Sequence, residues 1–326
     1  MRVHTDINNL PVFKNAALTI GTFDGVHCGH VQIIRQLKRE ASRLNGESVI
    51  ITFHPHPRTV ITGSKPEQSK TGIRLLNTLD EKIKLLTHHR IDHLVVVPFT
   101  LDFASQSAEA YISDFLVARF HPRCIIIGYD HRFGKDRAGD YRLLEKYQST
   151  FHYEVKEISE QVLHDVTVSS TCIRKSLNTG DVRTANEYLG YDYFFEGEVV
   201  KGNQIGRTLG YPTANIEVAD EQKLTPAYGV YAVVASVASP DGSFADPLFF
   251  PSLYGVMNIG IRPTIGDGKI MTEVHLFDFN EEIYGRKMRV YIRQFMRPEI
   301  KFATMDELVA QMKKDEAAAR KLVHMQ

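Results

Sequence analysis

The sequence contains no tryptophan and only three cysteines among its 326 residues. Cys28, Cys124 and Cys172 lie far apart, are odd in number and include no Cys-x-x-Cys spacing. This pattern argues against a disulfide framework and against a zinc site built from thiolates. Few cysteines without a pairing pattern are typical of a reducing compartment, so we expect a cytoplasmic protein.

The chain also lacks an excess of charge and lacks long hydrophobic runs. Its 39 basic and 39 acidic residues balance, so we expect no broad basic face and no nucleic-acid partner. No run approaches the length of a membrane span, and the first residues lack the apolar core of a signal peptide. We therefore expect no membrane partner. A length of 326 residues is sufficient for two domains.

The first 190 residues alternate between apolar runs and amphipathic segments. Short apolar runs predict strands, whereas the segment 29–44 has apolar residues at helical spacing. Strands that are apolar throughout and separated by amphipathic helices predict a parallel sheet that helices cover on both faces. The predicted strands are AALTIGTF, SVIITF, DHLVVVPF, RCIIIGYD and FHYEVKEI.

The pattern changes after residue 190, where short strand-like runs are separated by glycine, proline and asparagine. Such spacing is typical of a small antiparallel barrel. A helical segment with a charged face, 305–322, follows the last of these runs. We therefore predict an α/β domain at 1–189 and a β-barrel domain at 190–326.

The stretch GTFDGVHCGH, residues 21–30, lies between a predicted strand and a predicted helix. Its glycines, backbone N–H groups and helix start favour an anion. His27 and His30 could donate hydrogen bonds to phosphate oxygens and stabilise the charge gained when phosphorus is attacked. A metal would also take such a pair, but zinc needs further ligands that the nearby sequence lacks, and both histidines could equally be structural. The other residues expected to bind nucleotide phosphates here are Thr22, Phe23 and Gly29.

Three further stretches are expected to lie at the same edge of the sheet, where ligands of parallel sheets bind. TFHPHP, residues 52–57, offers His56, and GYDHRFG, residues 128–134, offers Asp130; we assign both side chains to substrate binding. VSSTCIR, residues 168–174, has hydroxyls that could cap a helix, which is often all that such a sequence does. It also presents a phosphate site with an arginine. The phosphate-binding candidates are Ser170, Thr171 and Arg174.

Together these four stretches resemble the FMN adenylyltransferase module of bacterial bifunctional riboflavin kinase/FAD synthetases. The His-x-Gly-His signature of the nucleotidylyltransferase superfamily is matched at residues 27–30, and the Ile-Ser-Ser-Thr-x-Ile-Arg signature is matched by VSSTCIR. The resemblance implies a flavodoxin-like α/β fold. It also implies that His27 and His30 contact the ATP phosphates, with Ser170, Thr171 and Arg174 on the opposite side.

One departure from this family lies in the loop GYDHRFG. The family commonly has Asn and Phe where this chain has Asp130 and His131. An acid near two phosphorylated substrates could repel them or help to hold Mg²⁺, so the role of Asp130 stays open.

The stretch GNQIGRTLGYPTANI, residues 202–216, dominates the second half of the chain. Its glycines, including Gly206, can bring backbone close to phosphates, and Arg207 adds a positive charge. Thr213 and Asn215 are two residues apart and so share one strand face, where their oxygens suit Mg²⁺ once nucleotide phosphates and water complete the shell. The same composition also fits a plain turn that enters a strand.

MTEVHLFDF, residues 271–279, places Glu273 and His275 on one strand face. A carboxylate there could take the proton of an attacking hydroxyl, although a single strand glutamate is usually just solvated. Together with GRTLGYPTAN, this strand resembles riboflavin kinase over residues 190–326. The resemblance implies a six-stranded antiparallel barrel, metal binding by Thr213 and Asn215, and Glu273 as the base for the riboflavin 5′-hydroxyl.

We therefore expect an enzyme with two activities in series, riboflavin kinase and FMN adenylyltransferase. Riboflavin, FMN and ATP would be its substrates, FAD its final product, and Mg²⁺ or another hard divalent ion its metal. A nucleotidylyltransferase with another acceptor, or a flavin- or nucleotide-sensing protein, remain the alternatives. The sequence leaves the oligomeric state open between a monomer and a weak oligomer.

Overall fold

The structure is a computed structural model that describes residues 1–63, 73–158, 168–202, 206, 209–244, 252–261 and 270–323. The chain divides into two compact units, Met1–Ser170 and Thr171–Gln326. The domain boundary that we place after residue 189 stays a prediction.

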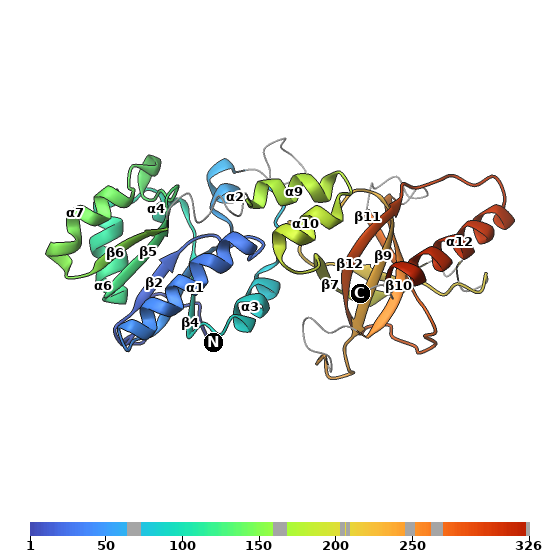
Figure 1. Ribbon diagram of the computed structural model, residues 1–326, viewed down its shortest axis with the longest axis horizontal. Helices are drawn as coiled ribbons and strands as arrows, with labels where there is room; N and C mark the ends of the chain where they lie inside the picture. The colour runs from blue at the N-terminus through green and yellow to red at the C-terminus, as the bar shows by residue number, and fades with distance from the viewer. Residues whose placement is uncertain are drawn as a thin grey trace. The chain divides into compact units, whose positions relative to one another are not determined.

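The first unit contains a six-stranded parallel sheet with the order β1-β4-β3-β2-β5-β6. Figure 1 labels β2, β4, β5 and β6 of this sheet. The central strands have almost no polar side chains and are buried on both faces, which confirms the predicted parallel sheet. The strands are β1 (Arg2–His4), β2 (Ala17–Ile20), β3 (Ser48–His54), β4 (His93–Pro98), β5 (Cys124–Gly128) and β6 (Glu154–Ile158).

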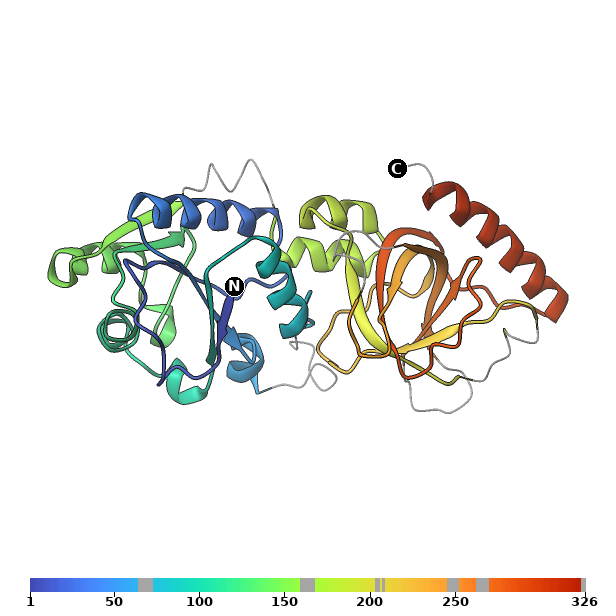
Figure 2. The same ribbon diagram turned by 90° about the horizontal axis from the view of Figure 1, so that it is seen from below.

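Helices cover both faces of this sheet, because alternate strand residues point to opposite sides. On one face, α1 (Cys28–Arg43) buries Ile34, Leu37 and Ala41. On the other face, Leu18 and its counterparts on neighbouring strands pack against the helical segment α5–η1–α6 (Figure 2). The remaining helices and helical segments are α2 (Pro57–Thr62), α3 (Leu79–His88), α4 (Leu101–Ala104), α5 (Ala108–Ala110), η1 (Tyr111–Val117), α6 (Ala118–Phe120), η2 (Lys135–Arg137) and α7 (Tyr141–Phe151).

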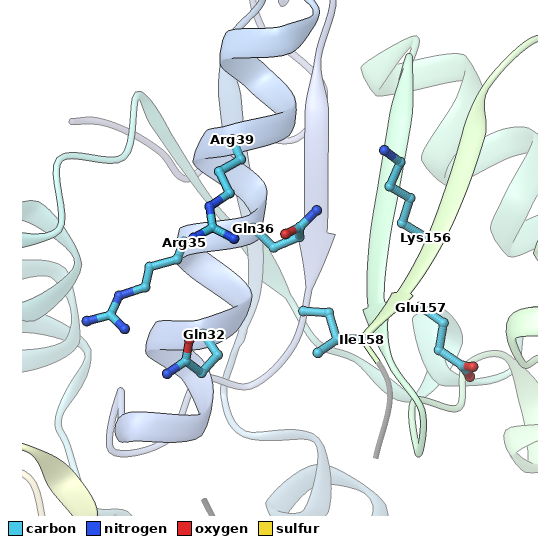
Figure 3. A pocket seen from close by; sticks show the side chains of 7 residues that line it. All are labelled: Gln32, Arg35, Gln36, Arg39, Lys156, Glu157 and Ile158. Atoms are coloured by element: carbon cyan, nitrogen blue, oxygen red, sulfur yellow. The ribbon is translucent and has the colours of Figure 1, made fainter. Parts of the chain in front are cut away.

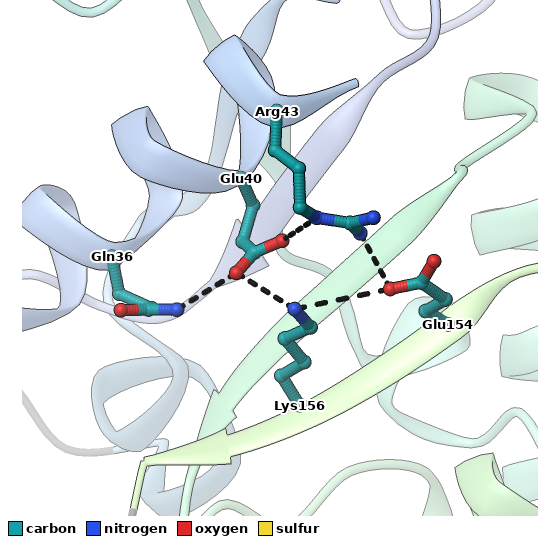
Figure 4. A network of polar contacts seen from close by, with 5 residues as sticks. All are labelled: Gln36, Glu40, Arg43, Glu154 and Lys156. Atoms are coloured by element: carbon teal, nitrogen blue, oxygen red, sulfur yellow. Dashed lines mark hydrogen bonds and ion pairs between the residues drawn. The ribbon is translucent and has the colours of Figure 1, made fainter.

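A polar network fixes the C-terminal half of α1 to the edge strand β6 (Figure 4). The buried Glu40 carboxylate accepts hydrogen bonds from Gln36 Nε2 at 2.9 Å and Arg43 Nε at 2.7 Å, and pairs with Lys156 Nζ at 2.8 Å. Arg43 also reaches Glu154 at 2.5 Å. Burial alone would raise the pKa of Glu40, but Lys156 and Arg43 outweigh it and hold the pKa below its ordinary value.

The second unit contains a closed antiparallel barrel with the strand order β10-β11-β8-β7-β12-β9. Together with α12 (Met305–Val323), the barrel confirms the prediction of six antiparallel strands and a terminal helix. The strands are β7 (Phe194–Val200), β8 (Ala214–Glu217), β9 (Gly229–Val237), β10 (Leu253–Ile261), β11 (Ile270–Leu276) and β12 (Lys287–Arg297).

Two helices precede the barrel, α9 (Ser170–Asn178) and α10 (Val182–Leu189). After the barrel, α12 is held by ion pairs from Arg297 to Asp315 at 2.6 Å and from Arg320 to Asp278 at 2.8 Å. None of the helices in the described part of the chain has the length and apolarity to cross a membrane.

Candidate active sites

The order of the parallel strands reverses at β2. The chain passes from β2 to β3 on one side, whereas β5 pairs with β2 on the other side. Ligands of open α/β sheets bind in the crevice expected at such a switch point, at the carboxyl ends of the strands. The loop 21–27 follows β2 and the loop 129–134 follows β5, so the topology places both predicted stretches at this expected crevice.

His27 and His30 lie together at the start of α1. His27 is the residue that precedes the helix, is only 6% exposed, and stacks on the ring of His30 with 3.7 Å between the ring centroids. Phe23 packs against the other histidine, with its ring centroid 5.0 Å from that of His30. A Cβ on Gly29 would come within 3.2 Å of the His27 ring, so the glycine leaves room for this stack.

The pair is suited to a negatively charged ligand. Burial lowers the pKa of His30 well below 6.5, and the charges of His27 and Lys82 lower it further, so His30 is uncharged at neutral pH. Its buried Nδ1 has no hydrogen-bond partner among the described residues. A neutral imidazole can donate one hydrogen bond, and the positive end of the α1 dipole lies at the same place. Buried donors at a helix start are a natural setting for phosphate oxygens.

Ser170 lies beside the histidine-bearing loop, as its predicted place at the same edge requires. Its hydroxyl donates a 2.9 Å hydrogen bond to the backbone carbonyl of Asp24. Thr171 and Arg174 follow Ser170 on α9, and Arg174 Nη2 lies 3.5 Å from Thr171 Oγ1. The phosphate-binding roles of all three side chains stay predictions.

His56 and Asp130 occupy different settings at the sheet edge. Backbone N–H of Arg58 donates to His56 Nδ1 at 3.2 Å, so this histidine caps α2, a role that the motif TFHPHP did not reveal. Asp130 is exposed after β5. Burial lowers the pKa of its neighbour His131 to about 4, against the opposing charge of Asp130, and His131 Nε2 has no partner among the described residues. Substrate binding by His56 and Asp130 stays a prediction.

In the barrel, the strand register places the kinase candidates next to each other. Glu273 of β11 lies directly opposite Asn215 of β8 and opposite Asn258 of β10. Ala214 and Val274 are buried inside the barrel, so Asn215 and Glu273 share its outer face. Directly paired residues on neighbouring strands have Cβ atoms about 5 Å apart. Thr213 precedes β8 by one residue.

The segment before β8 is held by close backbone approaches. His275 Nδ1 donates to the carbonyl of Pro212 at 2.9 Å, which fixes the residue before Thr213. A Cβ on Gly202 would overlap the side-chain amide of Asn215, and a Cβ on Gly206 would overlap the carbonyl of Tyr211. A side chain at 206 would therefore displace backbone, and one at 202 would displace the amide of Asn215, a predicted metal ligand. Arg207 lies outside the described residues.

Two other features of the first unit are not part of these constellations. A groove of about 400 Å³ between α1 and β6 contains none of the predicted residues (Figure 3). Its lining consists of Gln32, Arg35, Gln36, Arg39, Lys156, Glu157 and Ile158. Glu40, Cys124 and Glu154 have ligand atoms within 4.8 Å of one another, but Lys156 and Arg43 already bind the carboxylates, which disfavours a metal there.

Comparison with known proteins gives two family matches and several relatives. A family described as FAD synthetase matches residues 10–172, and a family described as riboflavin kinase matches residues 189–323. The chain is 36% identical to the bifunctional riboflavin kinase/FMN adenylyltransferase of Haemophilus influenzae, over 95% of this chain and 94% of that protein. It is 34% identical to the enzyme of the same description from Listeria monocytogenes, over 94% of this chain and 92% of that protein.

A solved structure shares the fold of the whole chain. A crystal structure from Streptococcus pneumoniae, described as a macrolide-efflux protein, matches with a TM-score of 0.82 and 27% identity. The match covers 98% of this chain and 98% of that chain. The α/β unit and the barrel therefore occur together in another solved protein.

Proposed function

The chain belongs to the family of bifunctional riboflavin kinases and FMN adenylyltransferases, and on this premise we propose which residues carry each reaction. The kinase reaction phosphorylates riboflavin to FMN with ATP. The adenylyltransferase reaction joins FMN to the AMP part of a second ATP and releases pyrophosphate. Family and relatives give both activities, whereas the residues below are our assignment.

For the adenylyltransferase, we propose that His27 and His30 donate hydrogen bonds to the ATP phosphates. The FMN phosphate itself attacks the α-phosphorus, so no protein nucleophile is needed. The two rings then stabilise the charge that develops on the phosphates, since preorganised donors act most strongly where water is excluded. Their stacking at the start of α1 supports this role. The residues proposed to bind the remaining phosphate oxygens are Thr22, Phe23, Gly29, Ser170, Thr171 and Arg174.

We assign His56 and Asp130 to the flavin substrate of the same reaction. Both follow strands that end at the crevice, β3 and β5. Because Asp130 is exposed and carries a negative charge, it would have to face the part of FMN that is remote from the phosphate.

For the kinase, the observation that carries the assignment is the pairing of Glu273 with Asn215. This pairing places a carboxylate beside an amide oxygen on the outer face of the barrel. Glu273 would orient or deprotonate the 5′-hydroxyl of riboflavin. Gly206, Arg207 and Thr213 would bind the ATP phosphates.

The oxygens of Thr213 and Asn215 fit a hard divalent cation such as Mg²⁺, because neutral oxygen ligands suit Mg²⁺ when phosphates and water complete the shell. A bound Mg²⁺ supplies charge neutralisation on the phosphates. Asn215 would also contact the substrate. Glu273 is the only proposed proton acceptor of this site, so removing it should separate binding from turnover.

We further propose that the adenylyltransferase domain spans 1–189 and the kinase domain 190–326. Helix α10 ends at Leu189, Gly190 follows in a left-handed conformation at φ 79°, and the first barrel strand starts at Phe194. A left-handed glycine directly after the last helical residue is typical of the end of a helix. We place the domain boundary at this helix end. We also propose that the enzyme is cytoplasmic and acts on small molecules without a nucleic-acid or membrane partner.

The test is a timed incubation of the protein with riboflavin and MgATP, followed by separation of riboflavin, FMN and FAD. We expect FMN to appear first and FAD to follow, and we expect FMN with ATP alone to give FAD. A parallel incubation with nicotinamide mononucleotide tests the alternative acceptor. FAD formation from neither flavin, or faster transfer to the alternative acceptor, would contradict the proposal.

A further inference from the structure

A buried lysine lies under the histidine-bearing loop and has no part in the reactions described above. Lys82, on α3, is 7% exposed. Lysine is almost never fully buried unless an acid pairs with it, because removing an ammonium group from water is costly. The charge of the buried Asp24 carboxylate favours the ammonium group, but the hydrogen bond of Nζ goes to a backbone carbonyl. We therefore ask what the buried ammonium group of Lys82 contributes at this position.

The ammonium group holds the start of the loop. Lys82 Nζ donates a 2.7 Å hydrogen bond to the backbone carbonyl of Thr22, and Thr52 Oγ1 donates to the same oxygen at 3.1 Å. The loop needs such support because Phe23 and Val26 are non-glycine residues at φ 47° and 38°. Left-handed conformations of such residues persist only where surrounding contacts impose them.

The charge of Lys82 also acts on the histidine pair. Burial is the main cause of the low pKa of His30, followed by the charges of His27 and Lys82. The pKa of Lys82 itself is lowered to about 8 by burial, with the carboxylate of Asp24 opposing this shift. Lys82 therefore stays mostly protonated at neutral pH. The charged and titratable groups around His30 are thus Lys82, His27 and, beyond the lysine, Asp24.

We propose that Lys82 is a positioning residue of the adenylyltransferase site, which fixes the loop of His27 and His30 through the Thr22 carbonyl and adds a buried positive charge beside the two rings. The inference rests on the proposed role of the histidine pair. A fixed cation at this place disfavours a second cation on His30 and attracts the negative charge of a triphosphate. Lys82 therefore affects both the conformation of the loop and the charge at its two histidines.

Two substitutions separate the two effects. Lys82→Met removes the charge and the hydrogen bond at similar volume, whereas Thr52→Val removes only the other hydrogen bond to the same carbonyl. A matched control is Lys38→Met, because Lys38 also donates to a backbone carbonyl, that of His89 at 3.0 Å, but is exposed.

The readouts are the titration of the His30 ring, followed by NMR with labelled histidine, and the kcat and KM of FAD formation. We expect Lys82→Met to raise the pKa of His30, because a neighbouring positive charge is lost, and to lower kcat for FAD formation about tenfold to a hundredfold. Thr52→Val should lower kcat less and leave the His30 titration unchanged. Lys38→Met should change neither, and riboflavin kinase activity in the same samples should stay unchanged throughout.

The proposal is overturned if Lys82→Met has normal kinase activity and an unchanged His30 titration, or if it forms FAD at the wild-type rate. Should Lys82→Met be recovered only as aggregate, Lys82→Gln decides, because it removes the charge but keeps an N–H donor for the carbonyl of Thr22. A raised His30 pKa in a folded Lys82→Gln protein supports the proposal, and the wild-type His30 titration in that protein overturns it. Wild-type FAD formation by His30→Ala would instead contradict the proposed function, while the His30 titration in Lys82→Met would still report on Lys82.

Discussion

The two catalytic regions position their side chains by different means. In the barrel, Glu273 and Asn215 are opposite each other in one antiparallel ladder, so backbone hydrogen bonds set their separation. In the α/β unit, His27 and His30 lie where a loop becomes a helix, and no ladder fixes that loop. Side chains from elsewhere in the unit do so instead, through Lys82 and Ser170.

This difference has a consequence for how each region responds to mutation. A ladder is built from many backbone hydrogen bonds, so a single side-chain change in the barrel should affect chemistry more than shape. The loop after β2 depends on a few side-chain contacts, so changes outside the catalytic residues can displace its histidines. Positions remote from the reacting atoms should therefore matter more for FAD formation than for FMN formation.

The largest effect is expected for Glu273, the proposed general base of the kinase reaction. Glu273→Gln keeps the side-chain volume but removes the carboxylate, and losing a general base costs on the order of 10²–10⁴ in rate. FMN formation should fall by that factor, whereas FAD formation from supplied FMN should stay unchanged. Both rates are measured by separating the flavins after timed incubation.

A matched control is Glu198→Gln, since Glu198 is an exposed glutamate on β7 of the same barrel. It should leave both rates unchanged. Near-wild-type FMN formation by Glu273→Gln would remove Glu273 from the mechanism.

The next effect concerns the loop of the α/β unit. His30→Ala removes one donor from the phosphate site, which should lower FAD formation about a hundredfold or more. FMN formation should be nearly intact. His88→Ala, at the exposed end of α3, serves as the control in the same flavin assay.

The loss of both activities in a folded His30→Ala protein would break the assignment of the two reactions to separate residues. Circular dichroism and the urea unfolding midpoint establish whether the variant is folded.

The fold class and many of the helices and strands could be predicted, because buried positions show up as apolar residues at regular spacing in the sequence. The apolar runs AALTIGTF and RCIIIGYD are typical of strands buried on both faces, and they are β2 and β5. The alternation in MTEVHLFDF predicted that Glu273 and His275 share a face, as β11 confirms. Local patterns of this kind depend on neighbours in the chain.

The pairing of Glu273 with Asn215 could not be predicted, because strand register depends on contacts between segments nearly 60 residues apart. Lys82 was also missed, since in DEKIKLL it looks like one residue of a solvated helix face. Its burial and its hydrogen bond to Thr22 depend on tertiary contacts that the helical pattern does not show. His56 was assigned to substrate binding, whereas its capping of α2 depends on a helix too short to predict from periodicity.

A smaller effect is expected for a substitution that adds a methyl group beside Asn215 in the proposed kinase site. Gly202→Ala would place a Cβ on the side-chain amide of Asn215, which would have to turn away to make room. Because Asn215 must move, we expect FMN formation to fall about tenfold while FAD formation is unchanged. The control is the same change made in an Asn215→Ala background, where the Cβ no longer meets the amide. A further loss of FMN formation in that background, equal to the loss caused by Gly202→Ala alone, would mean that the contact with Asn215 is not responsible.

The smallest effect on activity is expected remote from both sites, at the network of Glu40. Glu40→Gln should leave both reactions unchanged and lower the free energy of unfolding of the first unit by about 1–3 kcal/mol, because it weakens the buried bonds to Lys156 and Arg43. The folded-state pKa of Glu40 lies below its unfolded value, so its carboxylate stabilises the fold above about pH 4.5 and this contribution is lost as the pH falls through the lowered pKa. The difference between wild type and Glu40→Gln in urea unfolding should therefore be full at pH 7 and shrink toward pH 3. A difference that is independent of pH would mean that the network stabilises α1 and β6 by shape alone.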